Sequence, residues 1–153
     1  MRKKSLLVVL LLFPLIVMCA CSDQSKNTSQ PLSKDTVIYT VADNISIKSG
    51  INFDGETVLE SSDFIGFSYE FDENLQEYIF TFRLTDDGKK KNTEATKRLA
   101  EDSGCLSLWI GDELIVSPKV MEPITGDEVA INMVDLSKDT ISGFVEKLEG
   151  KHL

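Results

Sequence analysis

The stretch 65–84, IGFSYEFDENLQEYIFTFRL, decides the fold. Apolar side chains, most of them aromatic, occupy every second position of 65–71 and again of 78–84. A period of two is typical of a half-buried strand, so the stretch predicts two strands joined by the polar connection 72–77. We expect these strands to pair antiparallel and to turn their aromatic side chains toward a common core.

Further strands are predicted on both sides of this pair. Residues 36–42, TVIYTVA, are β-branched and aromatic, which favours a strand. The run 106–110 has apolar residues at alternate positions and leads into Gly111-Asp112, a two-residue hairpin signal. Residues 114–116 then form the returning strand, and 129–134 predicts a last one.

Two helices are predicted. The first is expected from Thr85, whose hydroxyl can cap free amide groups, to about Ala100. Its apolar face is thin, so we expect it to lie on the surface. Ser137 is expected to cap the second helix and Gly150 to end it. The apolar residues of the second helix share one face: Ile141, Phe144, Val145 and Leu148. The elements together predict a single α+β domain over 36–153, a mostly antiparallel sheet with two helices packed on it.

The N-terminal residues have the composition of an export signal. Cations at positions 2–4 precede the apolar run 6–20, which is short for a bilayer-spanning helix of roughly 20 residues. Residues 22–35 are polar and rich in serine, with too few apolar side chains to order themselves. We therefore expect a signal peptide over 1–20 and a flexible tether over 21–35.

The pair Ala20-Cys21 closes the apolar run with a small residue and a cysteine. This ending resembles the signal of bacterial lipoproteins, although Met18 stands where that pattern prefers leucine. The resemblance implies that the Cys21 thiol carries a diacylglyceryl group, that the chain is cut before Cys21, and that the new amine takes a fatty acid such as palmitate. Each buried CH₂ contributes about 0.8 kcal/mol, so two or three acyl chains suffice for stable anchoring to the extracytoplasmic face of the membrane. An uncleaved signal anchor and an ordinary secretory signal are the alternatives.

The charge balance excludes some partners. The formal net charge is −9, and loss of the three cations at positions 2–4 with the signal would leave −12. Such acidity favours solubility and argues against nucleic acid or an anionic membrane surface as a partner. The predicted first helix departs from this balance with Lys89-Lys90-Lys91 and Lys97-Arg98. These cations suit anionic lipid headgroups, an acidic segment of a partner, or merely a solvated face, and we favour the solvated face.

Little in the sequence points to catalysis. His152 is the only histidine and lies one residue from the C-terminus, where chain ends are usually mobile. With no other histidine, the sequence argues against Ser-His and Cys-His triads and most zinc sites. The acidic pairs fall at predicted turns or helix ends without EF-hand spacing, which indicates caps rather than metal ligands. These pairs are Asp54/Glu56, Asp72/Glu73, Asp86/Asp87 and Glu101/Asp102. We therefore predict no catalytic, cofactor-binding or metal-binding residue.

Cys105 and Trp109 belong to the same apolar region. Cys105 is the only cysteine after Cys21, and its apolar neighbours favour a buried thiol over a reactive or intermolecular one. In a strand, Trp109 points away from Leu108 and Ile110. It is then either covered by a second layer or exposed as a partner contact, and we favour the covered position.

One series of motifs is more distinctive. Leu84-Thr85-Asp86-Asp87-Gly88 opens a helix that contains Thr96. The apolar hairpin at Gly111-Asp112 then leads to Ser117-Pro118 and to Ile124-Thr125-Gly126-Asp127 before the last strand. This order resembles the head of the first periplasmic domain (P1 head) of SecD, a subunit of the protein-export translocase.

The resemblance covers residues 63–149, with three departures from the family pattern. Gly111-Asp112 inverts the usual Asp-Gly, Asp127 replaces a glycine, and Asn92 replaces an apolar helix residue. The resemblance implies an α+β head and a general role in engaging emerging preprotein. SecD itself has membrane helices that use the proton gradient, and no run after residue 20 is apolar enough for one.

The leading hypothesis is a non-enzymatic, membrane-anchored binding module that assists exported or envelope proteins. Its expected partners are the membrane, through the lipid at Cys21, and exported polypeptides or translocase components. A lipoprotein that binds a small ligand or a metal ion is the alternative. An extracytoplasmic hydrolase is disfavoured because the only histidine is at the chain end and no nucleophile elbow is present.

Overall fold

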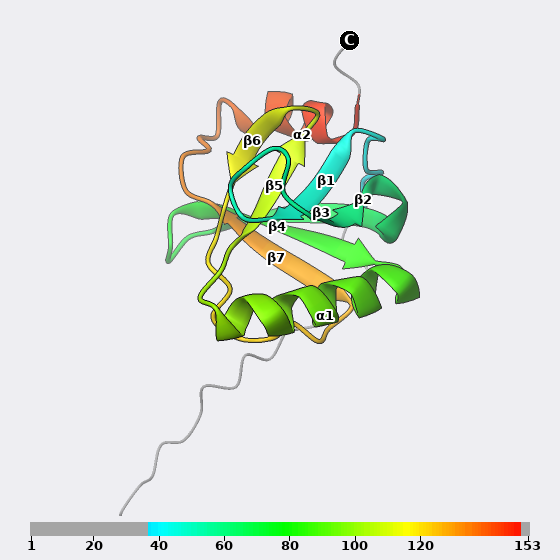
Figure 1. Cartoon of the computed structure of the whole chain (residues 1–153). Helices are drawn as coiled ribbons and strands as arrows, with labels where there is room; N and C mark the ends of the chain where they lie inside the picture. Colours follow the sequence, from blue (N-terminus) through cyan, green and yellow to red (C-terminus); the bar gives the residue numbers. More distant parts are fainter. Residues whose placement is uncertain (1–36, 151–153) are drawn as a thin grey trace, which may run out of the picture. The chain divides into compact units, whose positions relative to one another are not determined.

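Seven strands and two α-helices make up residues 37–150, the part of the chain that this computed structural model describes (Figure 1). The elements are β1 Ile45–Ser49, β2 Thr57–Glu60, the one-turn 3₁₀ helix η1 Ser61–Asp63, β3 Phe64–Asp72, β4 Glu77–Leu84, α1 Asp86–Glu101, β5 Leu106–Ile110, β6 Glu113–Val116, β7 Glu128–Met133 and α2 Ile141–Leu148. All of the described residues belong to one compact unit. None of their helices has the length and apolar character needed to cross a bilayer.

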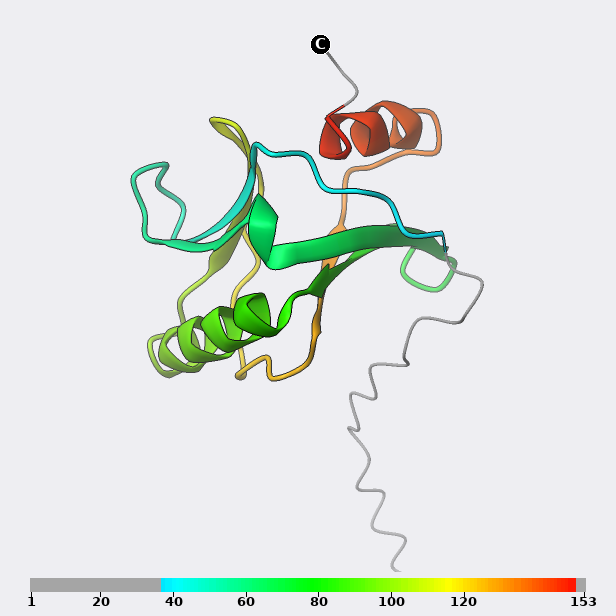
Figure 2. The same cartoon turned by 90° about the vertical axis from the view of Figure 1, so that its right-hand side faces the viewer.

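The strands form two separate antiparallel sheets. Sheet A has the order β3-β4-β7, and sheet B has the order β2-β1-β5-β6. The predicted α+β class and the antiparallel pairing are therefore confirmed, with the strands divided between two sheets. In the view of Figure 2, α1 lies below β3 and α2 lies above it.

The aromatic strand pair predicted within 65–84 is β3 and β4. Phe67 lies opposite Phe82, and Tyr69 lies opposite Phe80. The predicted alternation fails at one end, because the register shifts between Phe64 and Gly66. This bulge turns Phe64 inward, at 8% exposed, and leaves Ile65 at 59% exposed.

The core lies between the two sheets and continues under α2. Sheet B contributes Ile45, Ile47, Leu59, Leu106, Leu108 and Ile110, and sheet A contributes Phe67, Phe80, Phe82, Val129, Ile131 and Met133. The rings of Phe144 on α2 and Phe80 meet edge to face with centroids 5.2 Å apart. The helix face predicted for α2 is therefore the face that packs.

The prediction of a strand at 36–42 is wrong. Its described residues form a single bridge, in which Tyr39 and Phe67 exchange backbone hydrogen bonds of 2.7 and 2.9 Å. The chain then leaves sheet A, and the Ala42 N–H donates to the Leu148 carbonyl at 2.8 Å. The end of α2 thus holds this segment in place of a longer strand pairing.

The two glycines expected at the hairpin turn and after α2 are where the sequence predicted them, but the start of α2 is not. Gly111 has φ +61° in the two-residue turn between β5 and β6, and Gly150 has φ +69° just after α2, both conformations that suit glycine. The predicted Ser137 cap is wrong, because α2 begins at Ile141. The Ser137 carbonyl instead accepts the N–H groups of Thr140 and Ile141, each at 3.1 Å.

Candidate functional site

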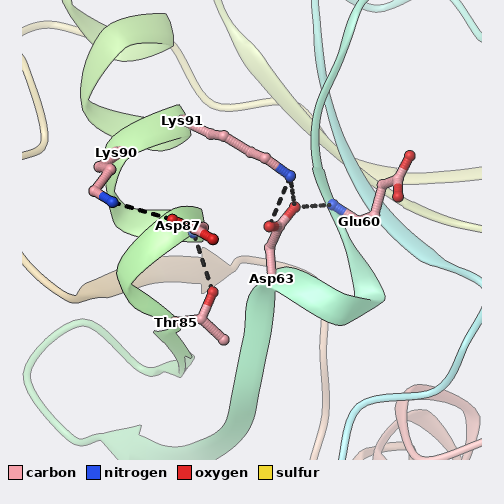
Figure 3. Close-up of polar contacts among 7 residues, drawn as sticks. Glu60, Asp63, Thr85, Asp87, Lys90 and Lys91 are labelled. Atoms are coloured by element: carbon pink, nitrogen blue, oxygen red, sulfur yellow. Dashed lines mark hydrogen bonds and ion pairs between the residues drawn. The ribbon is translucent and has the colours of Figure 1, made fainter.

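The motif Leu84-Thr85-Asp86-Asp87-Gly88 joins β4 to α1. The Thr85 hydroxyl oxygen accepts the Gly88 N–H at 3.1 Å, which is the predicted cap (Figure 3). The Thr85 N–H donates to the Asp63 carbonyl at 2.9 Å. The motif therefore fixes the start of α1 against η1.

Gly88 is required by the closeness of that contact. A Cβ atom at position 88 would lie 2.5 Å from the carbonyl oxygen of Asp63. Backbone cannot move aside as a flexible side chain can, so only glycine lets the first turn of α1 reach η1. The glycine of the motif is thus explained by packing.

Asp63 is a buried carboxylate, at 4% exposed, with charged and neutral donors around it. The Lys91 ammonium donates to both of its oxygens, at 2.8 and 2.9 Å, and the Glu60 N–H donates at 3.0 Å (Figure 3). The hydrogen bond to Asp63 raises the pKa of Lys91 above its ordinary value. Asp63 thus has the partners that a buried charge needs, which indicates a structural role.

The cations of α1 do not form a free basic surface. Lys90 pairs with Asp87 at 3.1 Å, and Arg98 pairs with Glu56 of the loop before β2 at 3.0 Å. The hydrogen bond to Glu56 raises the pKa of Arg98 above its ordinary value. With Lys91 bound to Asp63, three of the five predicted cations have acidic neighbours, which favours the solvated-face reading of this helix.

Thr96 joins α1 to the chain before β7. Its hydroxyl donates to the Asn92 carbonyl at 2.7 Å and accepts the Ile124 N–H at 2.9 Å. The Thr93 hydroxyl donates to the Ile124 carbonyl at 3.2 Å. Two helix side chains therefore hold both backbone groups of Ile124. The motifs that carry the SecD resemblance thus position elements in this chain, and none of them presents an open polar site.

An apolar opening, by contrast, lies between the free edges of the two sheets. One cavity of about 250 Å³ has Ile47, Leu106 and Leu108 as its floor and the chain at 118–122 and 129–131 as its sides. A hollow of about 360 Å³ lies between 113–116, 133–136 and α2. We call this opening the seam, with residues 113–122 and 128–136 as its lips. Figure 1 shows the chain between β6 and β7 running down to α1 before it returns as β7.

The seam is an apolar site with charges at its rim. Met121, at 82% exposed, and Val134, at 67% exposed, are apolar side chains on its two lips. Lys147 of α2 forms an ion pair with Glu113 across one end. Sequence reasoning missed this site, because it predicted a single sheet, whereas the strands of the two lips, β6 and β7, belong to different sheets.

The other residues singled out in the sequence have structural surroundings. Trp109 is 5% exposed, its indole N–H donates to the Ser107 hydroxyl at 2.9 Å, and the Phe53 ring lies against it at 5.4 Å. The covered position is thus confirmed. Cys105 is half-buried, so it is less enclosed than predicted. Cys21 and His152 lie outside the described residues.

The acidic residues that have partners in the structure lie at turns or helix ends, or pair with nearby cations. Asp72 accepts the N–H groups of Asn74 and Leu75 in the turn after β3. Glu56 and Asp87 pair with cations of α1. Within residues 37–150, no group of three His, Cys, Asp or Glu side chains is placed to hold a metal ion.

Comparison with known proteins supports the fold. No protein family matches the sequence, and no curated protein does. Solved structures do match, and two of them are one described as the structure and function of SecDF, a membrane component that enhances protein export, and one described as SecDF in a super-membrane-facing form. The TM-scores are 0.55 and 0.54, at 15% and 16% sequence identity, over 72% and 69% of this chain. The chain spans 63% and 18% of the matched chains. At this identity the likeness concerns the fold, and the domain is therefore folded like a domain of SecDF.

Proposed function

We propose that this chain is a non-enzymatic, extracytoplasmic lipoprotein whose SecD-like domain binds polypeptides that are being exported. The observation that carries the proposal is the likeness of fold to SecDF over 72% of the chain. The motifs of residues 84–127 follow one another in the order that is typical of the SecD P1 head. The lipid at Cys21 holds the domain at the membrane surface.

The seam is the surface that we assign to this binding. It is the place in the described residues where an apolar cavity, an apolar hollow and exposed apolar side chains adjoin. Exported chains are unfolded while they emerge, so they expose apolar side chains that a folded protein would bury. Three of the five cations of α1 pair with acidic side chains, which supports binding at the seam rather than at the helix.

Site-specific photo-crosslinking of the membrane-bound, full-length protein tests the proposal. A photoreactive phenylalanine analogue is placed at Met121 on the seam or, as a matched control, at Ile65. Both side chains are exposed and apolar, at 82% and 59%, so neither replacement disturbs the core. We expect a stalled exported protein to crosslink at position 121 and not at position 65. Equal crosslinking at both positions, or none at position 121, would count against the proposal.

A further inference from the structure

The sheet edges of this domain differ in how they are protected. Sheet edges can pair with other chains, and proteins usually cover, charge, shorten or kink them. The β2 edge lies against α1, and the β3 edge exchanges hydrogen bonds with Tyr39. β6 is only four residues long and is followed by Pro118. β7, with six residues, has a single charged residue, Glu128 at its start, and none of the other devices.

The sequence of β7 suits strand pairing. It reads Glu-Val-Ala-Ile-Asn-Met over 128–133, without proline, glycine or lysine. Its register with β4 is continuous from Arg83 opposite Glu128 to Tyr78 opposite Met133, so no bulge twists the edge away. Among the described residues β7 pairs with β4 alone. Its second edge is therefore open to a further strand.

The register also identifies the backbone groups on that open edge. The Leu84 N–H donates to the Asp127 carbonyl at 2.8 Å, which makes this the hydrogen-bonded kind of antiparallel pair. Pairs of this kind alternate along a ladder, so the backbones of Val129, Ile131 and Met133 face β4. The N–H and C=O groups of Glu128, Ala130 and Asn132 consequently point away from β4, along the free edge.

The hollows of the seam lie along this same edge. Val129 and Ile131 line the cavity at one end, and Met133 lines the hollow at the other. Side chains on one face of an extended strand recur every two residues, roughly 7 Å apart. The cavity of about 250 Å³ is smaller than the roughly 300–1,000 Å³ of pockets for drug-sized ligands. Its size suits single side chains of a strand better than a separate small molecule.

We infer that the free edge of β7 accepts an extended polypeptide segment as an added strand, with alternate apolar side chains placed in the seam. The inference rests on the proposed function and names how the exported chain is held. The backbone would supply the affinity and the alternating side chains the selectivity, as in strand addition elsewhere. The net charge of −9 favours segments flanked by basic residues.

Backbone methylation of a peptide tests the strand directly. The probe is a fluorescein-labelled peptide of alternating leucine and threonine with two lysines at each end. Its binding to the full-length protein in nanodiscs is followed by fluorescence anisotropy. Two further peptides carry N-methyl groups, one on the odd-numbered backbone amides and the other on the even-numbered ones. An added strand donates from one set only, so we expect one peptide to bind about tenfold or more weakly and the other nearly normally.

A variant of the protein gives the complementary test. Ala130→Pro removes an N–H that faces the free edge and that no bond to β4 uses, and Ala130→Ser retains it. We expect the proline variant to weaken binding of the unmethylated peptide about tenfold and the serine variant to leave it unchanged. Thermal unfolding of both variants checks that they fold.

The possible results separate the two proposals. If both methylated peptides bind as tightly as the unmethylated one, and Ala130→Pro does not weaken binding, strand addition is overturned. The proposal that the domain binds polypeptides would then still stand. A peptide with glutamates in place of the lysines should bind more weakly, and equal binding would overturn the charge preference. Failure of every peptide to bind, together with absent crosslinks at Met121, would overturn polypeptide binding itself.

Discussion

At the scale of single residues, Asn92 fits its surroundings least. It is fully buried in α1, and neither the oxygen nor the nitrogen of its side-chain amide has a hydrogen-bond partner in the structure. An unsatisfied buried polar group costs about 1–3 kcal/mol. The resemblance to the SecD head marks Asn92 as a polar residue at a position that is usually apolar in that family. What the sequence did not reveal was that no partner compensates for it.

Asn92→Leu is therefore expected to stabilise the domain by about 1–3 kcal/mol, because leucine has a similar size and leaves no polar atom unpaired. Urea unfolding followed by tryptophan fluorescence measures the change, since Trp109 is the only tryptophan. Asn92→Asp serves as the control and should destabilise, because it buries a charge. A loss of stability in the leucine variant would show that the amide has a partner, such as a bound water.

Gly88→Ala is expected to destabilise the domain, although alanine is the better helix former. Alanine in a helix interior gains about 1 kcal/mol over glycine, but its Cβ at position 88 would lie 2.5 Å from the Asp63 carbonyl oxygen. We expect a net loss of about 1–3 kcal/mol from the forced displacement. Gly143→Ala in α2 is the matched control, since nothing lies within 4 Å of its added Cβ. The same urea unfolding should show a gain there, and a gain at both positions would refute the packing explanation.

At the scale of elements, the sequence predicted best where a pattern was long. The alternation in 65–84 was sufficient to predict β3 and β4 as a pair, and the Gly111-Asp112 turn predicted the β5–β6 hairpin. β1 and β2 are as short as β5 and β6, but the connection between them, residues 50–56, lacks the two-residue turn that marked the other hairpin, so they were not predicted. The segment 36–42 has strand composition, yet its pairing depends on the distant end of α2.

The seam illustrates the same limit. Each of its lips was predicted in outline, as the strands near 114–116 and 129–134. That they face each other across an apolar cavity follows from the packing of two sheets. The sequence predicted one sheet, so it gave no reason to expect free edges to meet. A site that forms where two sheets pack side by side has no local signature in the sequence of either strand.

Thr96→Val is expected to loosen the chain before β7. Valine has a similar shape, but it removes both the donor to Asn92 and the acceptor for the Ile124 N–H. The amide of half-buried Ile124 then loses this hydrogen bond, at a cost of about 1 kcal/mol. Amide hydrogen exchange at Ile124 should accelerate along with the loss of stability. Thr93→Val removes a single bond of 3.2 Å and should have the smaller effect. Equal effects of the two variants would contradict the assigned role of Thr96.

At the scale of the whole molecule, the domain and the proposed anchor have complementary roles. The chain matches 63% of one SecDF chain and 18% of another, so the comparison covers a domain of a larger protein. A lipid at Cys21 would place this domain at the membrane, where exported chains emerge. Tethering raises the effective concentration of a weak binding site, to the millimolar range for short flexible linkers. An edge strand with modest affinity would then be sufficient for function.

Cys21→Ser tests that arrangement. Serine cannot form the thioether to a diacylglyceryl group, so the variant should lose labelling by radioactive palmitate and move from the detergent phase to the aqueous phase of Triton X-114. Cys19→Ser is the matched control: it alters the other cysteine near the cleavage point and should leave both properties unchanged. Because the anchor acts through effective concentration, Cys21→Ser should also reduce crosslinking at Met121 in cells while purified protein binds the peptide as before. A Cys21→Ser variant that stays in the detergent phase would contradict the lipid anchor, since an uncleaved signal would then hold the protein at the membrane.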